Sequence, residues 1–166
     1  SKPIGGDECS IVQALEECDE VRHYFVRCPA CGSYQIMTEE GLVMTEKTAS
    51  PQEVERRKLG RYKCAICKFL WSDHLRDQAV ARGRWEAENP VPSPRRIGFH
   101  LPAILSKAVS LSEIMAAKMR AEASDSPVVK QQYANGMWAM PFRAVELETT
   151  EDLILQHRDP EIGRAS

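Results

Sequence analysis

Cysteine is the residue type in this 166-residue chain with the clearest potential for chemistry. Four of the six cysteines form two tight C-x-x-C turns, Cys28 with Cys31 and Cys64 with Cys67. Two such turns (here the first and second knuckle) at a distance in the sequence are a strong signal for zinc. Four thiolates satisfy the tetrahedral preference of Zn²⁺ at about 2.3 Å per bond and leave no position for water. We therefore predict a structural Zn²⁺ site that stabilises a segment with little core of its own.

Other uses of these four thiols stay open at this stage. Two disulfides need an oxidising compartment, and nothing in the sequence indicates one. A thioredoxin-like redox centre needs one C-x-x-C in a βαβ context, whereas two lie here in strand-rich surroundings. An iron–sulfur centre fits four thiolates as well as zinc does. The remaining cysteines, Cys9 and Cys18, lack knuckle spacing and are predicted to be small buried residues beside a helix.

Positive charge gathers in the middle of the chain. Residues 51–100 carry 11 Lys and Arg against 6 Asp and Glu, although the whole chain has a net charge of −2. Such a basic centre indicates a polyanionic partner, while a solvated surface with local ion pairs explains it equally simply. The densest stretch supplies the candidate nucleic-acid contacts, which are Arg56, Arg57, Lys58, Arg61 and Lys63.

Several catalytic and membrane signatures are missing from the sequence. It has no G-x-x-x-x-G-K-[ST] phosphate loop and no G-x-S-x-G elbow, and no pair of carboxylates stands out from solvated faces. No apolar run approaches the roughly 18 residues that a membrane span requires, and no charged-then-apolar pattern is seen near residue 1, so we expect neither a membrane span nor secretion. We therefore expect no catalytic residue in this stretch.

The knuckles require strands on either side to position them. Alternation of apolar and polar residues predicts strands over 21–27, 34–38, 61–63, 69–71 and 97–101. Capping residues and apolar periodicity predict helices over 10–19, 51–59, 73–81, 110–123, 126–135 and 150–158, with Gly136 ending the fifth. The stripe on the fourth helix, formed by Leu111, Ile114, Met115 and Met119, is predicted to pack in the core. The expected fold class is α+β, with small zinc-ribbon β-hairpins flanked by helices and followed by a helical linker.

Four segments in order carry a family resemblance. They are HYFVRCPACG at 23–32, RYKCAIC at 61–67, GRW at 83–85 and IGFHL at 97–101. Together they resemble the middle of the large terminase subunit of lambda-like tailed phages, where a strand and two knuckles follow the ATPase core and G-x-W and G-F-H-L segments come after. Lys68 stands where that family often has a second glycine.

The resemblance implies a larger enzyme around this stretch. Its N-terminal ATPase would drive DNA into a procapsid, and its C-terminal nuclease would cut concatemers. ATP and Mg²⁺ are then expected only in the parent's other domains. The implied partners are double-stranded DNA, the small terminase subunit and the portal or procapsid. The implied location is the host cell cytoplasm, a homo-oligomer is possible, and no membrane partner is expected.

The same resemblance suggests a domain division. Residues 1–20 would end a preceding ATPase domain, 21–88 would form the zinc ribbon, 89–142 a proline linker with a helical connector, and 143–166 an acidic tail leading to a following domain. The main boundary is set by the three prolines within 89–96, which require an extended chain. Two rival functions stay open, a free-standing zinc ribbon that binds nucleic acid and a thiol enzyme that uses a C-x-x-C.

Overall fold

The computed structural model describes residues 15–47 and 49–140. Within these ranges the chain forms two small sheets and four α-helices, so the predicted α+β class is confirmed. The predicted helix over 150–158 and most of the one over 10–19 lie outside the described residues. Within the described part, every helix is too short or too polar to span a lipid bilayer.

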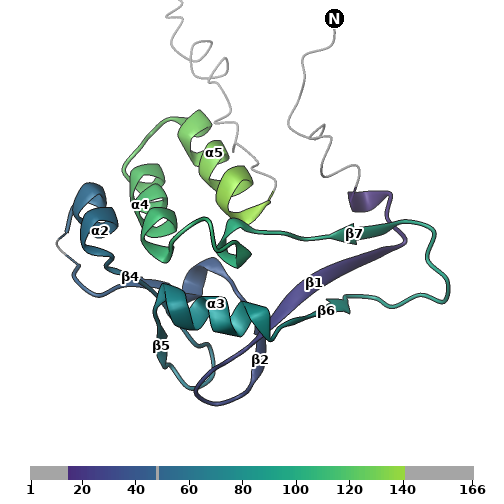
Figure 1. Cartoon of the computed structure of the whole chain (residues 1–166). Helices are drawn as coiled ribbons and strands as arrows, with labels where there is room; N and C mark the ends of the chain where they lie inside the picture. Colours follow the sequence, from purple (N-terminus) through teal and green to yellow (C-terminus); the bar gives the residue numbers. More distant parts are fainter. Residues whose placement is uncertain (1–14, 48, 141–166) are drawn as a thin grey trace, which may run out of the picture.

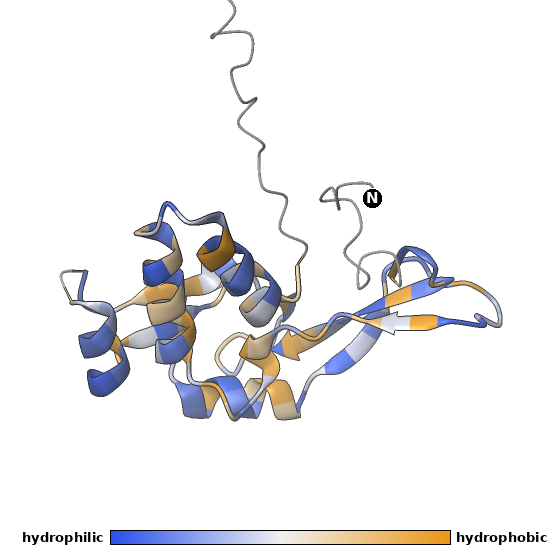
Figure 2. Cartoon of the chain, turned by 90° about the horizontal axis from the view of Figure 1, so that it is seen from above, coloured by the Kyte–Doolittle hydropathy of each residue, from blue (hydrophilic) through white to orange (hydrophobic). Residues whose placement is uncertain are grey.

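The first sheet is built around one long strand, β1 (Glu20–Arg27). On one edge it pairs antiparallel with β6 (Arg84–Ala87). On the other edge, β2 (Tyr34–Ile36) pairs antiparallel with the end of β1 and β7 (Ile97–Phe99) pairs parallel with its start. Strands β1, β6 and β7 reach away from the helices as an arm (Figure 1), and Figure 2 shows hydrophobic residues along it.

The second sheet carries the second knuckle. Its strands are β3 (Leu42–Met44), β4 (Gly60–Lys63) and β5 (Leu70–Trp71), all antiparallel in that order. The predictions for β1, β2, β4, β5 and β7 agree with the structure within a few residues. Strands β3 and β6 were not predicted, because each has only three or four residues and depends on pairing with a distant strand.

Serine caps fix the starts of three helices at the predicted positions. Helices α2 (Pro51–Arg57) and α4 (Leu111–Glu122) each begin with a complete capping box, made by a serine and a glutamate three residues later. Helix α3 (Asp73–Ala81) begins after Ser72, whose side chain accepts from the backbone of Leu75.

The predicted end of the fifth helix was wrong. Helix α5 (Pro127–Trp138) runs through Gly136, where a Cβ would meet nothing within 4 Å, and it ends only at Ala139 in the left-handed conformation. Gly136 therefore lies on an open face of the helix, where glycine is tolerated at a cost of about 1 kcal/mol relative to alanine. The buried ring of Trp138 keeps the last turn docked against the core.

A single buried cluster joins both sheets to the helices. Tyr62 and Trp71 of the second sheet pack in the same cluster as Leu111 and Ile114 of α4, which confirms the predicted core stripe. Helix α4 approaches β4 closely at Gly60, where a Cβ would lie 2.6 Å from the backbone of Leu111. This contact requires glycine and fixes α4 on the strand that leads into the second knuckle.

The proline-rich segment 89–96 connects β6 to β7. Its backbone is held by Asp19, whose carboxylate accepts from the N–H groups of Arg95 and Arg96 at 2.7 and 3.0 Å. The segment is therefore tied to the residue just before β1, and the domain division predicted from it stays a prediction.

Candidate metal centre

Both knuckles adopt the same backbone turn. In the first, the N–H of Gly32 donates to the carbonyl of Cys28 at 3.0 Å, and Gly32 has φ +74°. In the second, the N–H of Lys68 donates to the carbonyl of Cys64 at 3.1 Å, and Lys68 has φ 63°. Lys68 thus adopts the left-handed conformation that glycine provides in the first knuckle, so the departure from the family pattern leaves the turn intact.

The two turns bring the four predicted sulfurs to one point. All four Sγ atoms lie within 4.8 Å of one another. Across the knuckles, Sγ of Cys28 is 3.8 Å from that of Cys67, and Sγ of Cys31 is 3.9 Å from that of Cys64. Tetrahedral bonds of about 2.3 Å to one ion separate the sulfurs by about 3.8 Å. A disulfide would need about 2.05 Å, so these separations exclude a disulfide across the two knuckles.

Hydrogen bonds and burial shift the pKa values of three of these thiols in different directions. The hydroxyl and the backbone of Ser33 lower the pKa of Cys31 to about 6. Burial opposes ionisation of Cys64, but backbone donors of Cys67 and Ile66 lower its pKa overall. The backbone of Phe69 favours the Cys67 thiolate, yet burial and the three neighbouring sulfurs raise the pKa of Cys67 to about 12. The last proton is therefore hard to remove unless a cation balances the thiolates, and a metal ion does so.

One residue beside the cluster was missed by sequence reasoning. Gln35 of β2 is only 7% exposed, and its Nε2 donates to Sγ of Cys64 at 3.5 Å while its Oε1 accepts from the N–H of Ala65 at 2.9 Å. Its amide therefore links the first hairpin to the second knuckle and orients one of the four clustered sulfurs. No sequence signal indicated this, because alternation on a strand assigns a glutamine between Tyr34 and Ile36 to the solvent face.

The predicted basic stretch lies on α2 and β4, and part of it is already engaged. Arg57 makes two hydrogen bonds to the carboxylate of Glu46, at 2.8 and 2.6 Å. Arg61 donates to the carbonyls of Lys58 and Gly60. Arg56, Lys58 and Lys63 have no ion-pair partner within the residues described. The stretch therefore offers fewer charges to an external anion than its sequence suggests.

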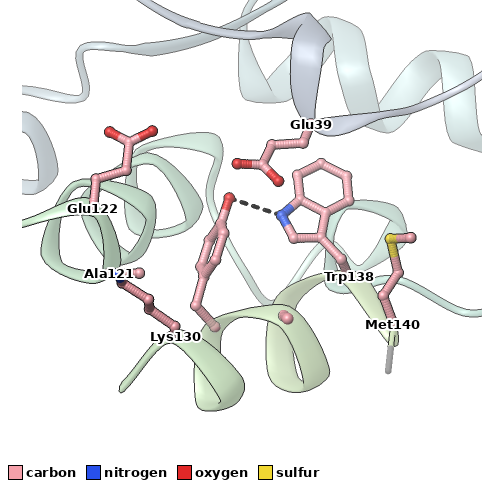
Figure 3. A pocket seen from close by; sticks show the side chains of 8 residues that line it. Glu39, Ala121, Glu122, Lys130, Trp138 and Met140 are labelled. Carbon is pink, nitrogen blue, oxygen red and sulfur yellow. Dashed lines mark hydrogen bonds between the residues drawn. The ribbon is translucent and has the colours of Figure 1, made fainter. Parts of the chain in front are cut away.

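A hollow of about 360 Å³, away from the four cysteines, lies between α4, α5 and the 3₁₀ turn Glu39–Gly41 (Figure 3). Trp138 donates from Nε1 to the hydroxyl of Tyr133 at 2.8 Å, and burial, helped by the carboxylate of Glu39, raises the pKa of Tyr133. Lys118 pairs with Glu39 at 3.3 Å and with Glu122 at 3.8 Å, so one ammonium partly balances two carboxylates. We assign no chemistry to this hollow, whose lining residues are Glu39, Ala121, Glu122, Lys130, Tyr133, Ala134, Trp138 and Met140.

Comparison with known proteins gives one match. The family model described as phage terminase large subunit gpA, ATPase domain, matches residues 1–85. This span contains both knuckles and the basic stretch and ends at Trp85. Comparisons with curated proteins and with solved structures gave no match.

Proposed function

The chain belongs to the family of phage terminase large subunits of the gpA type, and we propose that it serves this packaging motor as a zinc-ribbon connector. The family is the one that the motifs predicted. The connector role is our own step, and it is supported above all by four sulfurs placed for a single tetrahedral ion.

The zinc ion would act through structure. Cys28 and Cys31 from the first hairpin and Cys64 and Cys67 from the second would hold it, so that one ion fastens two small sheets together. Four protein ligands leave no open position for water or substrate, which is the property of a structural site. Bound zinc would supply folding free energy to this part of the chain.

The domain division that we propose is the one suggested by the sequence. Residues 1–20 would end an ATPase domain, 21–88 would form the ribbon, 89–142 would connect it onward, and 143–166 would lead to a nuclease domain. ATP and Mg²⁺ would act in the flanking domains. Double-stranded DNA, the small terminase subunit and the portal or procapsid would be the partners of the whole motor, and Arg56, Arg57, Lys58, Arg61 and Lys63 stay candidate DNA contacts.

Metal analysis tests this proposal. Protein purified without added zinc is expected to hold one zinc ion per chain, and Cys64→Ser is expected to lose it, because three thiolates bind the ion more weakly. Cys18→Ser, which changes a cysteine outside the cluster, is the matched control and should keep the ion. Finding four free thiols and no tightly held metal in the unaltered protein would refute the ribbon, and finding iron in place of zinc would correct the metal.

A further inference from the structure

We propose that a basic hollow on the first knuckle, lined by Arg27 and Arg82, binds a phosphate of the DNA backbone. The inference rests on the proposed function, because DNA is the polyanion that a packaging motor handles. It assigns the contact to residues outside the basic stretch at 56–63.

The hollow has a volume of about 360 Å³ and a polar lining. It is lined by residues 28–32 together with Arg27 at the end of β1 and Arg82, the residue that follows α3. Both arginines are exposed to solvent. Two cations facing one polar recess form a site that favours an oxyanion such as phosphate.

These two arginines differ from most others in the described part of the chain. Arg57, Arg96 and Arg120 each have a carboxylate partner within 2.8 Å. Arg27 donates only to the carbonyl of Gly32, at 3.3 Å, and Arg82 has no ion pair within the described residues. Their charge is therefore available to an external anion.

The surface beside the hollow carries a further arginine and a tyrosine that can contact DNA. Tyr34, the partner of Arg27 in the β1–β2 register, is 38% exposed. The guanidinium of Arg84 lies 4.0 Å from the centre of its ring. Arg84 also pairs with Glu86, so it adds less net charge than Arg27 or Arg82. Arginine and tyrosine side chains are common donors to the phosphates of a DNA duplex, so this surface extends the proposed contact along the strand.

A competing explanation is that the two arginines only balance the metal centre. Zinc with four thiolates carries a formal charge of −2, and two guanidinium groups beside it would offset that charge. This explanation predicts that a change at Arg82 weakens zinc binding and leaves DNA binding unchanged. Our proposal predicts the reverse, so measuring both quantities on the same samples separates the two.

The experiment measures binding of a short mixed-sequence DNA duplex to the full chain across a series of salt concentrations. Arg82→Glu is expected to weaken binding about tenfold at low salt and to lower the salt slope by about 0.9, the value for one phosphate contact. Arg95→Glu is the matched control, since its exposed side chain has no ion pair in the described part and lies on the distant 89–96 loop. It should stay within about twofold of the unaltered protein.

Zinc content is determined for each sample. If the unaltered protein retains zinc and Arg82→Glu binds DNA no more weakly than Arg95→Glu, the phosphate contact is refuted but the proposed zinc ribbon is not. If the unaltered protein holds no zinc, the zinc-ribbon proposal itself is refuted. Arg82→Gln removes the charge without placing a carboxylate near the thiolates, so it tests the contact even if Arg82→Glu loses zinc. Binding by Arg82→Gln equal to that of the unaltered protein would also overturn the proposal.

Discussion

Lys68 is a residue whose conformation conflicts with its side chain. It has φ 63° in the second knuckle, where the first has Gly32, and its Cβ makes that conformation costly by about 1 kcal/mol. Its ammonium donates to the carbonyl of Ala65 at 2.5 Å on the exposed surface, a contact of small net worth. The strain in this turn is therefore a property of the residue and can be removed by one substitution.

Lys68→Gly is expected to raise the free energy of unfolding of the zinc-loaded protein by about 1 kcal/mol, because glycine adopts a left-handed conformation without a Cβ clash. Denaturant unfolding monitored by circular dichroism measures this change. Lys68→Ala is the control, since it removes the ammonium contact but keeps the Cβ, and it should bring no gain. Equal stability of the glycine and alanine variants would show that the backbone strain contributes nothing.

The spacing of the cysteines was enough to predict that all four would meet, because two C-x-x-C turns are a strong signal for one shared metal site. Spacing could not reveal Gln35, whose role depends on its contact with Cys64, 29 positions away in the chain. Nor could it reveal that Arg57 is neutralised by Glu46, or that Arg27 and Arg82 line one hollow. These relations arise from tertiary packing and leave no signal in neighbouring residues.

Among the helices, α3 is joined to the rest of the fold by a buried arginine. Arg76 is only 1% exposed. Its Nε donates to Asp77 at 2.7 Å, and its two terminal nitrogens donate to the carbonyls of Ile104 and Val109 at 2.9 and 3.0 Å. Asp73, also next to this guanidinium, accepts from the backbone N–H that begins α4. One side chain therefore couples α3 to the segment that leads into α4.

Arg76→Met is expected to lower the free energy of unfolding by about 3–5 kcal/mol, because it leaves two carbonyls and a carboxylate without their buried partner. Arg120→Met is the matched control, since Arg120 forms an exposed pair with Glu55 at 2.8 Å and should cost at most about 1 kcal/mol. Thermal and denaturant unfolding of both variants check this. A loss as small for Arg76→Met as for the control would mean that the network contributes little to stability.

Helix starts were predictable for local reasons, whereas short strands were not. Ser50, Ser72 and Ser110 cap their helices through contacts three residues away, so the signal lies within one turn. Strand β6 exists because residues 84–87 pair with β1, some 60 positions earlier, and Trp85 packs between Tyr24 and Phe99. Gly136 was also predicted to end α5, but the packing of Trp138 outweighs the low helix propensity of this glycine.

At the scale of the whole molecule, the second sheet and helices α4 and α5 share one core within the described residues. Helix α4 packs on β4 and contributes to the same buried cluster as Tyr62 and Trp71, and α5 packs on α4. Two helices of this length have too little mutual contact to persist alone in water. The part that carries the four cysteines and the helical part should therefore fold as one unit, although the sequence suggested a boundary at 89–96.

Chelation of the metal is accordingly expected to unfold the helices together with the knuckles. Hydrogen exchange followed by mass spectrometry should show residues 111–122 losing protection in the same transition as residues 60–64, because α4 packs on β4 at Gly60. Adding zinc back should restore both regions together. If α4 kept its protection after the metal had been removed and the knuckles had opened, the connector would be an independent folding unit. The boundary near 89–96 would then divide the chain energetically, and the shared core would be too weak to couple its two sides.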